Sequence, residues 1–177
     1  MEKFGCMEKY GYEQLNYFYD KNTRLKALTC IHNTVLGPAL GGSRFWNYAN
    51  EEEAAYDVMR LARGMTYKSS LAGLPLGGGK TVIWGDTDSV KKDPILKEAF
   101  WRAFGRYLEG MGGRYITAED VGTTTQDMVY ISMETNHVVG LPVVRETRRP
   151  SLHWEFTGLC RHVANTCTAA IPSGVKP

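Results

Sequence analysis

Apolar and polar residues alternate along several short stretches of the chain, and these stretches are separated by segments whose apolar residues recur at helical spacing. Residues 25–32 alternate as a strand does, residues 81–85 form a mostly apolar run typical of a buried strand, and residues 115–118 form a further strand. Residues 8–19 predict a helix followed by a strand that packs on the surface. Val138 and Val139 form the last element of this alternating series of strands and helices.

Three later segments have the pattern of amphipathic helices. The first begins after Asn50, which can cap it while Glu53 completes a capping box, and it runs toward Gly73. The second covers residues 95–109 and the third, a short one, covers residues 126–134. Because strands and helices alternate, we predict an α/β fold with an open, mostly parallel sheet and flanking helices. Its ligand crevice is expected beyond the carboxyl ends of the strands.

Lys68 lies near the end of the first of these helices. Leu61, Met65 and Lys68 follow one another at i, i+4 and i+7, which places the lysine on the edge of the apolar face. On this pattern alone, the favoured interpretation is a lysine whose stem covers apolar surface while its amine reaches water.

Three consecutive glycines followed by a lysine stand out within residues 71–81, LAGLPLGGGKT. Glycine weakens an ordered element by roughly 0.5–1 kcal/mol relative to alanine, so Gly77–Gly79 indicate backbone that another group approaches closely. A phosphate-binding loop is disfavoured for two reasons. Leu74 occupies the position where the motif requires a glycine, and a helix precedes the loop and a strand follows it, which is the reverse of the order that the motif needs. The open alternatives for Lys80 are a solvated side chain on a Gly-rich turn and a functional amine.

Two other segments are expected to lack regular structure. Residues 36–44, LGPALGGSR, form a second glycine cluster, interpreted as a loop whose turn presents backbone N–H groups to a ligand. Residues 86–94 are interpreted as a polar, charged connection.

Composition excludes several classes of function. The formal net charge of the 177 residues is +2, and residues 143–177 contain five Lys or Arg against two acids, which leaves 16 basic and 17 acidic residues elsewhere. This balance indicates neither a nucleic-acid nor a membrane partner. The cysteines lack metal-site spacing, so we predict no metal, free thiols and a cytoplasmic protein; they are Cys6, Cys30, Cys160 and Cys167. The sequence has neither an N-terminal apolar signal core nor an apolar run that could span a bilayer.

Four ordered motifs resemble the NAD-dependent amino-acid dehydrogenases of the glutamate, leucine, phenylalanine and valine group, most closely the leucine type. The motifs are LGPALGGSR (36–44), RLARGMTYK (60–68), LGGGKTVI (76–83) and GGRYITAEDVGTT (112–124). The resemblance covers about 140 residues from the start of the chain. It implies oxidative deamination of a branched-chain L-amino acid to its 2-keto acid, with NAD as hydride acceptor, by a homo-oligomer that assembles through this domain.

The resemblance also implies roles for individual residues. Lys80 corresponds to the catalytic lysine, and Asp120 to its acidic partner in proton transfer. Lys68 corresponds to the lysine that holds the substrate carboxylate. The other implied substrate-binding residues are Gly41, Gly42, Met65, Leu40 and Ala118. A lysine that is partly desolvated and faces a second ammonium has its neutral form favoured, which suits it to act as a base near neutral pH.

The family continues into a second domain that binds NAD on a GxGxxG turn, and these 177 residues contain no such turn. We therefore expect residues 1–141 to form the substrate-binding and oligomerisation domain, without a complete NAD site. The chain alone is then expected to be inactive. The alternative interpretation is a non-catalytic assembly module left by truncation.

Residues 142–177 form an irregular tail without helical or strand period. Residues 152–158, read one base earlier, can encode Thr-Ala-Leu-Gly-Val-Tyr-Arg, part of the motif that opens the linking helix of the family. Our hypothesis is a one-base frameshift near residues 142–145, which predicts a non-homologous, disordered tail. Sequencing the coding DNA tests this hypothesis.

Overall fold

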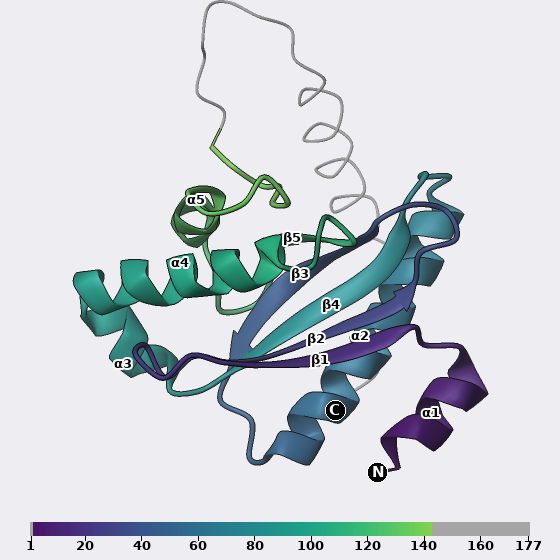
Figure 1. Ribbon diagram of the computed structural model, residues 1–177, viewed down its shortest axis with the longest axis horizontal. Coiled ribbons are helices and arrows are strands. Elements are labelled where there is room, and N and C mark those ends of the chain that lie inside the picture. Colours follow the sequence, from purple (N-terminus) through teal and green to yellow (C-terminus); the bar gives the residue numbers. More distant parts are fainter. Residues whose placement is uncertain (1, 143–177) are drawn as a thin grey trace, which may run out of the picture. The chain divides into compact units, whose positions relative to one another are not determined.

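The computed structural model describes residues 2–142, which contain five strands and five helices (Figure 1). The strands are β1 (Gln14–Tyr19), β2 (Lys26–Asn33), β3 (Ala39–Trp46), β4 (Gly77–Trp84) and β5 (Tyr115–Glu119). The helices are α1 (Lys3–Tyr10), α2 (Glu51–Leu71), α3 (Thr87–Lys92), α4 (Pro94–Glu109) and α5 (Thr125–Ser132). The tail from residue 143, and with it the frameshift hypothesis, Cys160 and Cys167, lies outside the described residues.

All five described strands belong to one sheet, in the order β1-β2-β4-β3-β5. Strand β2 runs against its neighbours, because it pairs antiparallel with both β1 and β4. Strand β3 pairs parallel with β4 on one side and with β5 on the other. Four of the five described strands therefore point the same way, which confirms the predicted open, mostly parallel sheet with flanking helices.

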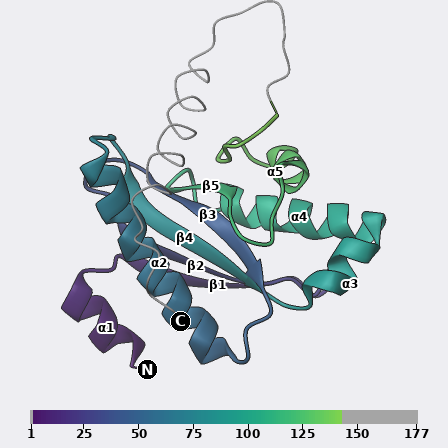
Figure 2. The same ribbon diagram turned by 180° about the vertical axis from the view of Figure 1, so that it is seen from behind.

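Helix α2 covers one face of the sheet and α4 covers the other (Figures 1 and 2). Successive residues of a strand point to opposite faces, so neighbours in β4 enter different cores. Val82 belongs to the cluster that contains Val58 and Met59 of α2. Ile83 belongs to the cluster that contains Trp101 of α4. This alternation decides which strand residues share a face with Lys80.

Helix α2 begins as the sequence predicts. The Asn50 side chain accepts a hydrogen bond from the Glu53 backbone N–H at 2.9 Å. The Glu53 carboxylate accepts from the backbone N–H of Ala49, also at 2.9 Å, and not from that of Asn50, so the reciprocal half of the predicted box is displaced by one residue. The helix ends at Leu71, two residues before Gly73.

Both glycine clusters lie in strands, which corrects the sequence analysis. Residues 39–44 of the expected loop belong to β3, a strand with neighbours on both sides, and β4 starts at Gly77, four residues earlier than predicted. The reason is close packing: a Cβ at Gly41 would overlap the carbonyl oxygen of Gly79, and a Cβ at Gly78 would overlap the backbone nitrogen of Thr66 in α2. Residues 86–94 also contain a helix, α3, which Asp86 caps.

Two further expectations concern thiols and membranes. Cys6 and Cys30, the cysteines within the described part of the chain, are free thiols. None of the helices between residues 2 and 142 has both the length and the apolar character needed to cross a membrane.

The close packing of α2 on β4 predicts opposite effects for the same substitution at two glycines. Gly78→Ala should destabilise the fold by about 1–3 kcal/mol, because its methyl group has no space against Thr66. Gly64→Ala is the matched control in α2, where no atom lies within 4 Å of the added Cβ, and it should stabilise the fold by up to about 1 kcal/mol. Urea denaturation measures both changes, and equal stabilities for the two variants would contradict this packing.

Candidate functional site

Lys80 lies in the middle of β4, on the face of the sheet that α2 covers. Only 4% of the residue is exposed to solvent. Its Nζ atom lies 3.1 Å from Oδ1 of Asp120. The interpretation of Lys80 as a solvated lysine is therefore wrong, and the structure brings together the two residues predicted to be catalytic.

The ion pair passes over strand β3, which lies between the two strands that supply its members. The register of Ser43 beside Thr81 places Gly42 next to Lys80, and Gly42 pairs with Ala118 on the other side. A Cβ at Gly42 would lie only 2.8 Å from the Cβ of Asp120. Gly42 thus leaves the space in which the Asp120 side chain reaches across the sheet.

The turn after β5 holds the backbone of Asp120. The Asp120 N–H donates to Oγ1 of Thr123 at 2.8 Å, and this hydroxyl lies 3.1 Å from the carbonyl oxygen of Ser43, to which it donates. Asp120 thus follows a strand's carboxyl end as predicted. Lys80 does not follow the carboxyl end of a strand, because it lies within β4. The site therefore lies on the face of the sheet as well as at its edge.

A second cation shares the Asp120 carboxylate. Nε of Arg44, on β3, lies 2.9 Å from Oδ2 of Asp120, and Nη1 of the same guanidinium lies 3.0 Å from Oδ2 of Asp57 on α2. The Tyr48 hydroxyl donates to that same Asp57 oxygen at 2.7 Å, and Arg60 contacts the other oxygen. The sequence analysis missed this network. Because these residues have the composition of a loop, the alternation that places Arg44 and Gly42 on one face is apparent only in the structure.

These charges shift the pKa of both members of the central pair. Burial lowers the pKa of Lys80 below its ordinary 10.5, and the Arg44 charge lowers it further, while Asp120 opposes both effects. For Asp120, burial favours the protonated form, but the charges of Lys80 and Arg44 outweigh it and hold the pKa of the carboxyl below 3.8. The arrangement favours a carboxylate beside an amine that loses its proton more readily than an ordinary lysine does.

Lys68 and Met65 lie on the edge of α2 that faces β3. Asp57, which contacts Arg44, is followed by Leu61, Met65 and Lys68 at helical spacings that keep all four on one side of the helix. The side chains of Met65 and Lys68 are half-buried. The structure therefore places both residues on the side of α2 where the Arg44 network lies.

The remaining predicted residues divide between the two faces of the sheet. Leu40 is 7% exposed and alternates onto the same face as Gly42, and Ala118, half-buried, shares that face with Asp120. Gly41 lies on the opposite face, where its carbonyl oxygen accepts a hydrogen bond from Tyr115 Oη at 2.6 Å. Leu40 and Ala118 thus share the face of the sheet on which Lys80 lies, and Gly41 contributes only backbone.

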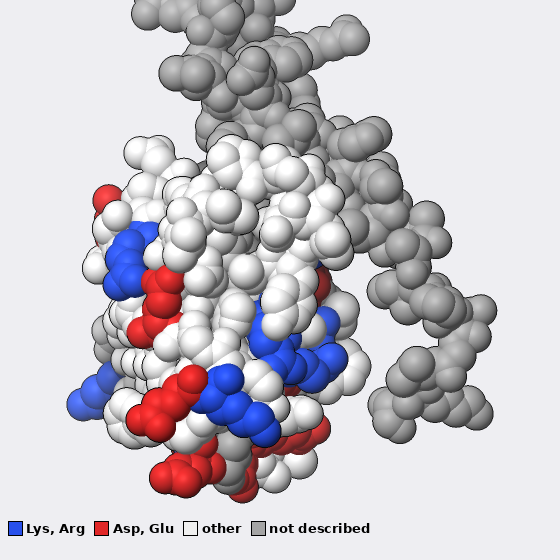
Figure 3. Space-filling model, turned by 90° about the vertical axis from the view of Figure 1, so that its right-hand side faces the viewer, with Lys and Arg blue, Asp and Glu red and all other residues white. Residues whose placement is uncertain are grey.

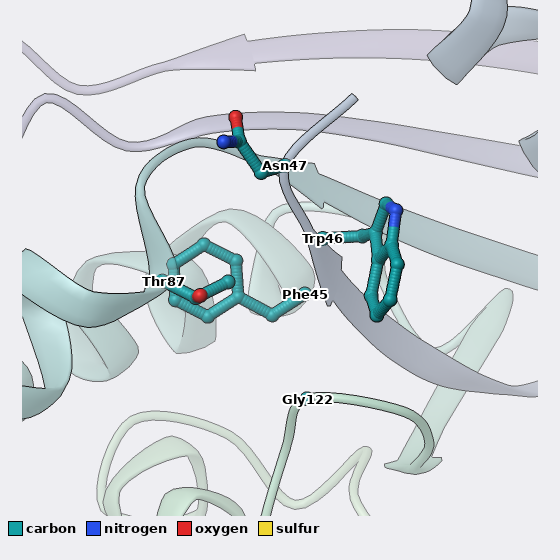
Figure 4. Close-up of a pocket in the computed structure, with 5 residues that line it drawn as sticks. All are labelled: Phe45, Trp46, Asn47, Thr87 and Gly122. Carbon is teal, nitrogen blue, oxygen red and sulfur yellow. The ribbon is translucent and has the colours of Figure 1, made fainter. Parts of the chain in front are cut away.

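A cavity of about 230 Å³ lies near the carboxyl end of β3 (Figure 4). Its lining consists of Phe45, Trp46, Asn47, Thr87 and Gly122. None of the residues predicted for the site lines this cavity. It therefore lies apart from the Lys80–Asp120 pair, and we assign the chemistry to the ion pair, where the charged groups converge.

The Gly77–Gly79 run does not have the setting of a dinucleotide-binding turn, and the expectation that the chain has no complete NAD site stays a prediction. A pyrophosphate needs a Gly-rich turn between a strand and the start of a helix, and Gly77–Gly79 lie within β4. On the face shown in Figure 3, Lys and Arg side chains lie among Asp and Glu side chains. The expectation that the protein has no nucleic-acid partner stays a prediction.

The chain is similar in sequence to several known dehydrogenases. The family model described as Glu/Leu/Phe/Val dehydrogenase, dimerisation domain, matches residues 15–137. A leucine dehydrogenase of Bacillus subtilis (strain 168) is 57% identical over 152 residues, which cover 85% of this chain and 40% of that protein. A valine dehydrogenase of Streptomyces virginiae is 49% identical over 130 residues, covering 73% of this chain and 35% of that protein.

A solved structure is similar in both fold and sequence. The L-tryptophan dehydrogenase of Nostoc punctiforme superposes with a TM-score of 0.71 and 41% identity, covering 77% of this chain and 39% of that one. The chain spans about 40% of the length of the first curated relatives it matches.

Proposed function

Because the chain belongs to the Glu/Leu/Phe/Val dehydrogenase family, we propose that it supplies the substrate-binding half of an amino-acid dehydrogenase of the leucine type. The reaction is oxidative deamination of a branched-chain L-amino acid to its 2-keto acid, with NAD as hydride acceptor. One observation carries the proposal: a lysine that is 4% exposed contacts a carboxylate at 3.1 Å across a glycine of the intervening strand. The predicted cytoplasmic location stays an expectation from the sequence.

In this proposal Lys80 is the base. Its lowered pKa increases the neutral fraction near neutral pH, and the neutral amine takes a proton from the water that attacks the imine carbon. Asp120 is ionised over the same pH range before the reaction, so it can accept a proton from the substrate amine during it. The pair thus supplies two proton acceptors of different basicity within one contact.

Lys68 and the apolar positions provide substrate recognition. Lys68 binds the substrate carboxylate from the edge of α2, where its half-buried side chain shares the β3 side of the helix with Met65. Leu40, Met65 and Ala118 contribute aliphatic or small side chains. Such a lining suits a branched aliphatic side chain better than a phenyl ring.

A second candidate function is assembly, and it is compatible with the first. The matching family model describes a dimerisation domain. Strand β1 is at one edge of the sheet and exposes Tyr17 and Tyr19, which are 45% and 59% accessible. Exposed aromatic residues beside an unpaired strand edge are typical of a protein contact. We therefore propose a homo-oligomer that forms through this domain.

Replacing Lys80 tests the catalytic assignment. We suggest a chimera that joins residues 1–141 to the remaining part of the Bacillus subtilis leucine dehydrogenase, assayed by NADH formation with leucine. Lys80→Ala should lower kcat by at least about 100-fold, the scale of one general base, and Lys68→Ala should chiefly raise KM.

Lys97→Ala is the matched control for that experiment. Lys97 also pairs with a buried aspartate, Asp127, at 2.9 Å, but on α4 and α5 at the opposite face of the sheet. Lys97→Ala should reduce the stability of the chimera and leave kcat per folded molecule near that of the unsubstituted chimera. Normal turnover by Lys80→Ala would refute the assignment.

The 177-residue chain itself separates catalysis from assembly. Because its 177 residues contain no GxGxxG turn, we expect no NADH formation with leucine, valine, isoleucine or phenylalanine. Light scattering should nevertheless give at least twice the mass of 19.8 kDa. Turnover by the isolated chain would contradict the first expectation, and a monomer at micromolar concentration would contradict the second.

A further inference from the structure

We propose that Arg44 is a positioning residue of this site: it fixes the Asp120 carboxylate and keeps that carboxylate ionised while Lys80 gains and loses its proton. The inference rests on the proposed function, in which Lys80 and Asp120 are the reacting pair. The catalytic roles carried over by the resemblance do not include Arg44.

The geometry divides the Asp120 carboxylate between two cations. Oδ1 lies 3.1 Å from Nζ of Lys80, and Oδ2 lies 2.9 Å from Nε of Arg44. Each oxygen therefore has its own cationic partner, and the contact with Arg44 fixes the rotation of the carboxylate in which Oδ1 faces Lys80. A charge-assisted hydrogen bond of this length is among the stronger polar contacts in proteins.

Arg44 is itself held from a second direction. Its Nη1 atom contacts Asp57 of α2 at 3.0 Å, and the same Asp57 oxygen accepts a hydrogen bond from the Tyr48 hydroxyl at 2.7 Å. The carbonyl oxygen of Tyr48 accepts from Nε1 of Trp84, at the end of β4. Because α2, β3 and β4 all contribute, the guanidinium has little freedom to leave Asp120.

The chemistry gives this second cation a purpose. When Lys80 becomes neutral, Asp120 loses the charge that favours its ionised form, and burial then favours protonation of the carboxyl. The guanidinium of Arg44 does not deprotonate, so one positively charged group always remains in contact with the Asp120 carboxylate. The same charge repels the ammonium form of Lys80 and so favours the neutral amine.

The other charged groups near this pair lie on α2. Asp57 and Arg60 neighbour Arg44, and Lys68 lies further along the same helix. Arg60 contacts Asp57 from the solvent side, with 53% of its side chain exposed. Arg60→Gln is therefore a matched control, which removes one guanidinium from the network without removing the contact to Asp120.

The test follows the Asp120 carboxyl carbon by ¹³C NMR in the 177-residue chain as pH is lowered. In Arg44→Gln the midpoint should rise by about one pH unit or more relative to the unsubstituted chain. In Arg60→Gln it should change far less. An Asp120 midpoint that is unchanged in Arg44→Gln, or that rises equally in both variants, would overturn the proposal.

Arg44→Lys keeps the test decisive if Arg44→Gln does not fold. A lysine retains the charge but cannot contact Asp120 and Asp57 through separate nitrogens, so the Asp120 midpoint should rise by a smaller, measurable amount. An Asp120 midpoint in Arg44→Lys identical to that of the unsubstituted chain would overturn the proposal that the guanidinium positions the carboxylate.

A kinetic readout and the NMR titration together separate this proposal from a merely structural role and from the proposed function. In the chimera, Arg44→Gln should move the rising limb of the kcat/KM profile to higher pH, because loss of the Arg44 charge raises the pKa of Lys80. The NMR titration uses neither substrate nor NAD, so it decides the role of Arg44 even if Lys80→Ala retains turnover.

Discussion

The absence of a side chain at Gly42 is the constraint on which the site depends. Lys80 and Asp120 come from strands that are not neighbours, and the strand between them would normally place a side chain where their charges meet. Glycine at that position lets the two side chains meet over bare backbone. The same need for close approach explains why glycines recur in β3 and at the start of β4, although glycine lowers the stability of a strand.

Burying the lysine has a cost that its partners offset. Removing an ammonium from water is unfavourable by several kcal/mol even after relaxation, and a carboxylate at hydrogen-bond distance compensates only part of this. The lowered pKa of Lys80 records the uncompensated part. Replacing a buried ion pair with apolar residues of similar size is often neutral or stabilising, so stability alone does not account for the pair.

Periodic patterns made part of this architecture predictable from the sequence. Helices α2 and α4 and strands β2 and β5 follow from apolar spacing and a cap. Strand β3 and the first half of β4 did not, because local propensity interprets glycine-rich sequence as loop, and only the packing of distant backbones makes it strand. The pairing of Lys80 with Asp120 came from resemblance, since no local pattern indicates that residues 40 positions apart meet across a third strand.

The Arg44 network marks the limit of sequence reasoning in a different way. Arg44 lies on β3, Asp57 lies on α2 and Asp120 lies in the turn after β5, and each residue alone resembles an ordinary surface charge. Their contacts depend on the register of β3 against β5 and on how α2 lies over the sheet. Buried hydroxyls on the opposite face depend on strand register in the same way. Thr29 contacts Thr81 at 2.7 Å because of the register of β2 against β4, and Ser43 contacts Thr117 at 2.6 Å because of the register of β3 against β5.

The most direct test of the account is the pKa of Lys80 in the 177-residue chain, measured by NMR of its side-chain carbon next to the amine. A folded-state pKa below that of the unfolded chain means that the unfolded state binds more protons between the two values, so the Lys80 contribution to stability grows as pH rises through that interval. We predict a midpoint clearly below 10.5 for Lys80. A midpoint at or above 10.5 would contradict it, because the amine would then be an ordinary stabilising cation and not a base prepared for proton transfer.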